Sequence, residues 1–301
     1  MMERRKVIQQ GKGTLTMSLP TKWVKQVHLK AGDELLIEEQ GLRLVIGTTI
    51  QKRDNKTTID VGTLLPTLVY SLLQNRYIRG DDEITVTYHT PEQYEAIIRE
   101  VQWLIGFELV EHTKNVCILK ELARSDHENF DQLLRRVYLI LLGMAEEGIT
   151  AMQKKDEVMI KSIGKRDDSI NRLISYCLRV LHKHADVDLQ KSMYLHTLLN
   201  FLEALGDQYS RFYVGAPNFS QGTIKLAKRV SIFLRHFYEL SYKWDIEKAN
   251  QLRIERDRIR AEIDKKLSKN LAKDDLLSLF HLRRIADLIM DIEKFQIAMQ
   301  V

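Results

Sequence analysis

The residues best suited to chemistry in this chain are the cations near its N-terminal end. Seven Lys and Arg side chains precede residue 31, against one carboxylate, that of Glu3: Arg4, Arg5, Lys6, Lys12, Lys22, Lys25 and Lys30. This segment carries a net charge of +6 (7 − 1), while the whole chain carries +5, so the remaining residues sum to −1. A compact basic segment on a nearly neutral body is suited to binding the phosphates of nucleic acid. We therefore expect contact with double-stranded DNA.

The elements that must position these cations form a small β unit. Residues 11–13, Gly-Lys-Gly, separate two short runs, which predicts a hairpin. Pro20 suits the start of a short helix over 21–28, because the N–H that Pro lacks would be unpaired there. Two more strands are expected at 34–38 and 42–46. A unit this small buries too little surface to fold alone, so we expect it to complete its core by pairing with a second copy.

The same segment resembles a known family of DNA-binding domains. The resemblance rests on five short motifs: Gly11-Lys12-Gly13, Ser18-Leu19-Pro20, Trp23-Val24-Lys25, Lys30-Ala31-Gly32-Asp33 and Leu42-x-Leu44. In combination they are similar to the SpoVT/AbrB swapped-hairpin domain over about residues 4–48. The resemblance implies a domain at 1–48 that forms a homodimer by interlacing hairpins. It also implies that DNA is contacted by Arg4, Arg5, Lys6 and Lys12.

Residues 49–124 are expected to form a small α/β middle segment after a polar linker at 51–56. Hydrophobic periodicity defines its elements, with Pro66 tolerated only near a helix start. The expected elements are helices over 61–79 and 91–105 and strands over 83–88, 107–111 and 116–120. Two isolated histidines, His89 and His112, fit surface side chains with ordinary partners better than they fit metal ligands.

From residue 125 onward, long amphipathic patterns with little Pro or Gly predict an all-helical body. Residues 166–171 are echoed after 89 positions (255 − 166), and residues 202–207 after 80 positions (282 − 202). These echoes predict two three-helix units, 125–216 and 217–301. The expected helices are 127–154, 156–183, 187–214, 220–246, 248–268 and 273–299.

The helical body resembles the PhoU family of tandem three-helix bundles, which is associated with phosphate regulation. In that family the second and third helices of each unit carry paired acids, and Asp167, Glu203 and Asp207 match these positions. Some relatives hold metal clusters through such acids. The resemblance therefore implies a possible divalent metal (Fe, Mn, Zn or Mg) in the first unit, with four candidate ligands: Asp167, Asp168, Glu203 and Asp207. Glu203 and Asp207, four residues apart, share a helix face.

The chain departs from the PhoU pattern at several acidic positions. Asn171 replaces the second acid of the first unit, which removes one anionic ligand. In the second unit three acids are replaced by Arg256, Arg260 and Arg283, and Arg284 lies beside them. Arginines would repel a cation, so we expect them to pair internally with Asp257 and Asp287. Together with residues 104–111, the three segments resemble archaeal PhoU-type phosphate uptake regulators that carry an AbrB-like head.

The sequence thus predicts an α+β multidomain protein that regulates rather than catalyses. It contains no nucleophile–base pair, phosphate-cradling glycine loop or metal–histidine motif, so an enzyme is the weakest hypothesis. The leading hypothesis is a dimeric DNA-binding transcriptional regulator of phosphate uptake or homeostasis, whose body senses a partner. The alternative is an adaptor that binds a phosphate transporter or signalling protein and keeps a vestigial head. The intact basic residues favour the regulator.

Cysteine usage and hydropathy predict a cytoplasmic location. Cys117 and Cys177 each stand alone in an apolar run, as buried thiols do in a reducing compartment. The longest apolar run, 137–144, is too short to cross a bilayer, so no membrane insertion is expected.

Overall fold

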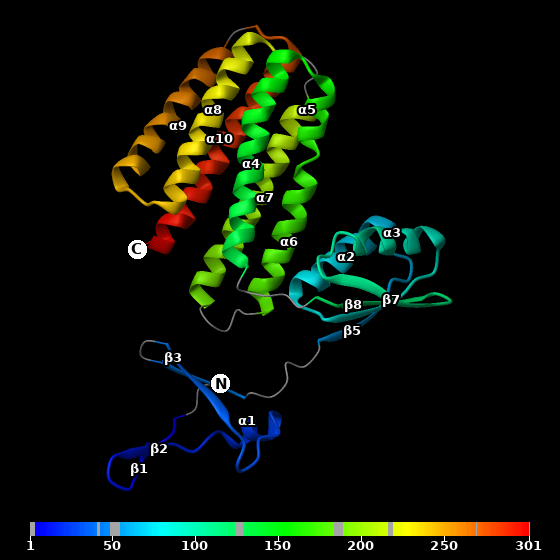
Figure 1. The fold of residues 1–301 in the computed structure, drawn as a ribbon, viewed down its shortest axis with the longest axis vertical. Helices are drawn as coiled ribbons and strands as arrows, with labels where there is room; N and C mark the ends of the chain where they lie inside the picture. Colours follow the sequence, from blue (N-terminus) through cyan, green and yellow to red (C-terminus); the bar gives the residue numbers. More distant parts are fainter. Residues whose placement is uncertain are drawn as a thin grey trace. The chain divides into compact units, whose positions relative to one another are not determined.

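The chain folds into two units, Met1–Arg53 and Asp54–Val301. The computed structural model describes residues 4–40, 43–48, 55–123, 129–183, 189–215, 219–268 and 270–300 (Figure 1). Several predicted features lie outside these residues: most of the 51–56 linker, Leu42, the start of the helical body at 125, and the boundary at 216–217.

The first unit has the predicted order of elements: β1 (Ile8–Gln10), β2 (Thr14–Thr16), α1 (Thr21–Gln26), β3 (Leu35–Gln40) and β4 (Arg43–Thr48). β1 pairs antiparallel with β2, and β3 pairs antiparallel with β4. Gly11 and Gly13 have φ values of 72° and 110°, so the β1–β2 turn requires glycine at both positions. Helix α1 ends at Gln26, two residues before the predicted end, because His28 adopts a left-handed conformation with φ 54°.

The described residues of the first unit include no buried side chain. Large apolar side chains are exposed on all four strands or beside them: Val7, Ile8, Leu15, Met17, Leu36, Ile37, Leu44 and Val45. Leu15 is 69% exposed and Leu36 62% exposed. A single copy of this unit therefore lacks a hydrophobic core of its own.

The second unit begins with a four-stranded sheet, whose strand order is β5-β6-β8-β7. Its elements are β5 (Lys56–Asp60), α2 (Pro66–Arg79), β6 (Glu83–Thr87), α3 (Pro91–Val101), β7 (Phe107–Thr113) and β8 (Val116–Glu121). β5 runs parallel to β6, and the other pairs are antiparallel. Val69 and Leu73 of α2 and Ile97 of α3 share a buried core with Ile84 and Leu119 of the sheet.

Three sequence predictions in this segment need correction. Lys56 is not the end of a linker, because it begins β5, which the sequence analysis missed. The helix predicted from 61 begins at Pro66, since Leu65 is extended and caps α2. The helix predicted to reach Ile105 ends at Val101, and Gly106 then leads into β7 with a positive φ.

The helical body comprises α4 (Phe130–Lys154), α5 (Glu157–Gly164), α6 (Asp167–Lys183), α7 (Leu189–Gly215), α8 (Gln221–Tyr242), α9 (Ile246–Leu267) and α10 (Lys273–Gln300). The prediction of a single helix over 156–183 is wrong, because these residues form two helices, α5 and α6. Asp167 and Asp168 open α6, where the helix dipole favours acids.

The sequence predicted two three-helix units; the body has seven helices, which we describe in chain order as α4–α7 and α8–α10. They run alongside one another in Figure 1, with α7 packed on α10 and α4 on α8. Phe201 and Phe295 meet across α7 and α10 with ring centres 5.5 Å apart. One continuous buried core joins both groups. In the described part of the chain, no helix is both long and apolar enough to cross a membrane.

Candidate functional sites

The basic residues of the first unit lie at both ends of the β1–β2 hairpin. Arg4, Arg5 and Lys6 precede β1 and are exposed, and Arg5 Nη1 donates to Ser18 Oγ at 3.4 Å. Lys12 is exposed in the turn between Gly11 and Gly13, at the opposite end. A three-residue strand spans about 10 Å. The four cations are therefore spread along the hairpin and do not converge on one point.

The structure brings the acids of the first helical group close together. Burial and the charge of Asp207 raise the pKa of Asp167 to about 7. Burial also raises the pKa of Glu203, with Asp207 as the second cause. Gly206 permits this approach, because a Cβ there would lie 2.7 Å from Asp167 Oδ1. The charges of Asp168 and Glu203 raise the pKa of Asp167 further, by smaller parts.

The sequence analysis did not predict one partner of this cluster, Arg211. Arg211 Nη2 lies 2.7 Å from Asp207 Oδ2, one helical turn further along α7. The four-residue spacing from Asp207 could have revealed this pair. Among the residues that the structure describes, no three His, Cys, Asp or Glu side chains are arranged to hold a metal ion. The chemistry of the acids is suitable for a divalent cation, but Arg211 competes for Asp207.

The arginines of the second helical group pair with nearby acids. Arg256 Nε lies 2.9 Å from Asp257 Oδ1, and Arg260 Nε lies 3.6 Å from Asp287 Oδ1, as the sequence predicted. Arg283 pairs with Asp264, which was not expected. This face of α9 and α10 thus carries alternating charges that neutralise one another.

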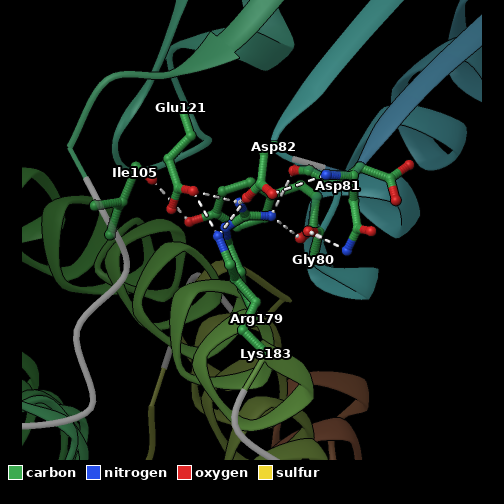
Figure 2. A network of polar contacts seen from close by, with 9 residues as sticks. Gly80, Asp81, Asp82, Ile105, Glu121, Arg179 and Lys183 are labelled. Atoms are coloured by element: carbon green, nitrogen blue, oxygen red, sulfur yellow. Dashed lines mark hydrogen bonds and ion pairs between the residues drawn. The ribbon is translucent and has the colours of Figure 1, made fainter. Parts of the chain in front are cut away.

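A buried arginine joins the helical body to the α/β segment (Figure 2). Arg179 of α6 is fully buried, and its Nη1 donates to the carbonyl oxygens of Tyr77 at 2.7 Å and Asp81 at 2.8 Å. Its Nη2 lies 3.3 Å from Asp82 Oδ1 and 3.1 Å from Glu121 Oε2. The guanidinium carbon lies 4.9 Å from the ring centres of both Tyr77 and Phe107.

Lys183, one turn beyond Arg179, pairs with the same two carboxylates of Asp82 and Glu121. Gly80 caps α2 in a left-handed conformation with φ 100°, and a Cβ there would lie 3.0 Å from Lys183 Cγ. Ile78 and Tyr176 pack against both hydrophobic cores. The α/β segment is therefore attached to α6 by ion pairs as well as by apolar contacts. The only sequence signal was a lone Arg in the apolar run 177–181.

The isolated histidines have ordinary partners. His89 Nε2 lies 2.6 Å from Asp60 Oδ1, and His112 Nε2 lies 2.8 Å from the Tyr88 hydroxyl. Cys117 and Cys177 are free and buried, as predicted, and burial raises the pKa of the Cys177 thiol to about 12.

Comparisons with known proteins give one likeness. No model of a known protein family matches the chain. No curated protein matches it. Among solved structures, the chain is similar to the phosphate transport system regulatory protein PhoU from Streptococcus pneumoniae, with 17% sequence identity and a TM-score of 0.46. The match covers 58% of this chain and 94% of that chain. At this score and identity the likeness does not establish a shared fold, and it assigns no ligand or partner.

Proposed function

We propose that this chain is a non-enzymatic regulator of phosphate uptake or homeostasis that acts by binding other proteins through its helical body. The observation that carries the proposal is the pairing of α4–α7 with α8–α10 around one core. An all-helical body of this kind is consistent with the bundles that the sequence resemblance to PhoU implies. The acids at the family positions, Asp167, Glu203 and Asp207, also come together. A phosphate transporter or a signalling protein is the partner class that fits this role.

Deletion of the gene tests the regulatory role. Uptake of radioactive phosphate should fall on transfer from low to high phosphate in wild-type cells and should stay high in cells that lack the gene. An expression plasmid for the full chain should restore the response. If the deletion leaves the response of uptake unchanged, the proposed function is wrong.

A second role, DNA binding by a dimer of the first unit, is supported by a separate observation. This unit exposes its apolar side chains and carries four exposed cations before β1 and in the β1–β2 turn: Arg4, Arg5, Lys6 and Lys12. Dimerisation would cover the apolar residues and double the basic hairpins. The resulting surface would suit phosphates on both sides of a DNA groove. This role would make the chain a transcriptional regulator, in line with the leading hypothesis from the sequence.

The two roles predict different effects of one substitution set. Replacing Arg4, Arg5, Lys6 and Lys12 by Ala removes charge from the hairpin without touching the helical body. An adaptor should keep its control of phosphate uptake after this change, whereas a DNA-binding regulator should lose it.

A further inference from the structure

Glu100 of α3 is a buried carboxyl group that faces no hydrogen-bond donor. Its side chain is 0% exposed, and neither carboxylate oxygen has a hydrogen-bond partner among the described residues. It lies beside a cavity of about 10 Å³ that is also lined by Tyr70 and Gln74 of α2 and by Asn171 and Ser175 of α6. Glu100 is therefore enclosed where the α/β segment meets the helical body.

The other polar groups around this cavity do not supply the missing donor. Gln74 Nε2 donates to Ser175 Oγ at 3.2 Å, so that amide hydrogen is already used. Asn171 Oδ1 is itself a buried acceptor that lacks a partner among the described residues. Acceptor oxygens thus gather here, and a proton on Glu100 is the simplest way to relieve them.

Two acids and one arginine lie near this part of the junction. Asp168 of α6 and Glu203 of α7 act together with Glu100 to raise the pKa of Tyr70, after burial. Arg172 of α6 lines the cavity, but burial alone raises the pKa of Glu100, to about 8. Burial of Glu100 is therefore what disfavours its ionised form.

Glu100, on α3, lines the same cavity as Asn171 and Ser175, which begin a stripe of residues on α6. Asn171, Ser175, Arg179 and Lys183 follow at four-residue spacing, so they share one helix face. The far end of the stripe is fixed by the ion pairs of Arg179 and Lys183 with Asp82 and Glu121. At the near end, the described contacts are the Gln74–Ser175 hydrogen bond and the packing around Glu100.

We propose that Glu100 is a proton-binding switch in the junction between the α/β segment and the helical body. While it is protonated, α2 and α3 pack against the Asn171–Ser175 end of the stripe. When it ionises, water enters the cavity and this end loosens, while the Arg179 end holds. The junction then acts as a hinge whose closure depends on pH.

The direction in which pH changes stability follows from the raised pKa of Glu100. The pKa of Glu100 rises from the ordinary 4.5 to about 8 in the folded chain. The unfolded chain thus releases this proton at lower pH than the folded chain. The contribution of Glu100 to stability is greatest below about pH 4.5, falls between 4.5 and 8, and then levels off. Within this window each pH unit lowers the folding equilibrium constant by up to about tenfold.

Glu100→Gln tests the proposal in the full chain, with Glu95→Gln as the control. Glu95 lies on the exposed face of the same helix. Urea unfolding should show Glu100→Gln gaining stability over wild type between pH 5 and 8, by up to about tenfold in the folding constant per pH unit, with a constant difference from pH 8 to 9. Glu95→Gln should follow wild type throughout. Parallel curves for wild type and Glu100→Gln would overturn the proposal.

Two further measurements report the switch in the folded protein. Trp103 lines the same cavity, so its fluorescence, in a chain with Trp23→Phe and Trp244→Phe, should become more accessible to acrylamide as pH rises from 7 to 9. Unchanged quenching across this range would contradict opening.

If Glu100→Gln does not fold, carbon-13 NMR of the wild-type glutamate carboxyls decides the matter. A Glu100 signal that titrates near 8 supports the proposal, and one that titrates near 4.5 overturns it.

Discussion

Arg179 of α6 donates a buried hydrogen bond of 2.7 Å to the main-chain carbonyl oxygen of Tyr77, near the end of α2. The same guanidinium stacks over the Tyr77 ring at 4.9 Å. One side chain of the helical body thus satisfies the last turn of a helix in the α/β segment. This contact makes the two parts of the second unit depend on each other for stability.

Removing Arg179 should destabilise the second unit strongly. Arg179→Ala leaves Lys183 as the remaining cation beside the carboxylates of Asp82 and Glu121 and removes the Arg179 donor from the carbonyl oxygens of Tyr77 and Asp81. The change should cost about 3–5 kcal/mol, because it breaks a buried ion-pair network. Urea unfolding at pH 7 measures the loss. Arg136→Ala, at an exposed position of α4, is the control and should change stability by less than about 0.5 kcal/mol. Equal effects of the two substitutions would show that the Arg179 network contributes nothing specific.

Glu203→Gln should be neutral or stabilising in metal-free buffer at pH 7. The pKa of Glu203 is raised by burial and by Asp207, so its ionised form is disfavoured in the folded chain and stability falls as pH rises through its titration. Because the site is partly open to solvent, the gain should not exceed about 1 kcal/mol. A clear loss of stability in urea unfolding would mean that this carboxylate has a favourable partner.

Added metal should reverse the effect of Glu203→Gln on stability. If Asp167, Glu203 and Asp207 hold a divalent ion, manganese, iron or zinc should raise the melting temperature of the wild type but not of Glu203→Gln. The binding should be weak, because Asn171 removes one anionic ligand and Arg211 pairs with Asp207. Arg211→Ala should then strengthen the response. No metal-dependent shift in either chain would exclude the metal and leave this face as part of a protein-binding surface.

The full chain should form a dimer through its first unit. Leu15→Asp combined with Leu36→Asp places charges on exposed apolar positions that a partner copy would cover, so sedimentation equilibrium should show a monomer. Val158→Asp provides a control, since Val158 is 81% exposed in the helical body. A wild-type chain that is monomeric at micromolar concentration would refute the swapped-hairpin interpretation.

DNA binding, if the first unit performs it, should depend steeply on salt. Arg4→Ala, Arg5→Ala and Lys12→Ala together should weaken binding and flatten the slope of log affinity against log salt by about 0.9 for each lost phosphate contact. Lys154→Ala and Lys155→Ala, on exposed positions of the helical body, should leave the slope unchanged. A slope that the three hairpin substitutions do not alter would place the contact surface elsewhere.

The sequence predicted those features that depend on local signals. Gly11 and Gly13 indicated the hairpin turn, and the amphipathic periods indicated the helices of the body. Strand β5 was missed because, of its five residues, Ile59 alone is buried, which leaves little hydrophobic alternation to detect. The division between α5 and α6 was missed because the apolar pattern continues through Gly164 without a proline.

In the candidate sites, too, the sequence predicted only what local spacing or resemblance could indicate. The acids Asp167, Glu203 and Asp207 were found through resemblance, and Arg211 could have been found from its spacing. The partners of Arg179 could not, because Tyr77 precedes it by 102 residues and Glu121 by 58 (179 − 121). Glu100 likewise faces α6 only after the α/β segment has packed on the body. Contacts of this kind depend on tertiary packing, which the local pattern does not encode.

The most direct test of the proposed function measures phosphate uptake in cells that lack the gene and express the chain with Arg4, Arg5, Lys6 and Lys12 replaced by Ala. The expected result is that this variant restores the fall of uptake at high phosphate as fully as the wild-type chain does, because the helical body is unaltered. Arg179→Lys, which keeps the charge but loses the paired donors, should restore the response less well. If the four-alanine variant is folded, dimeric and equally abundant, yet fails to restore the response, the helical body does not act alone and the adaptor proposal is contradicted.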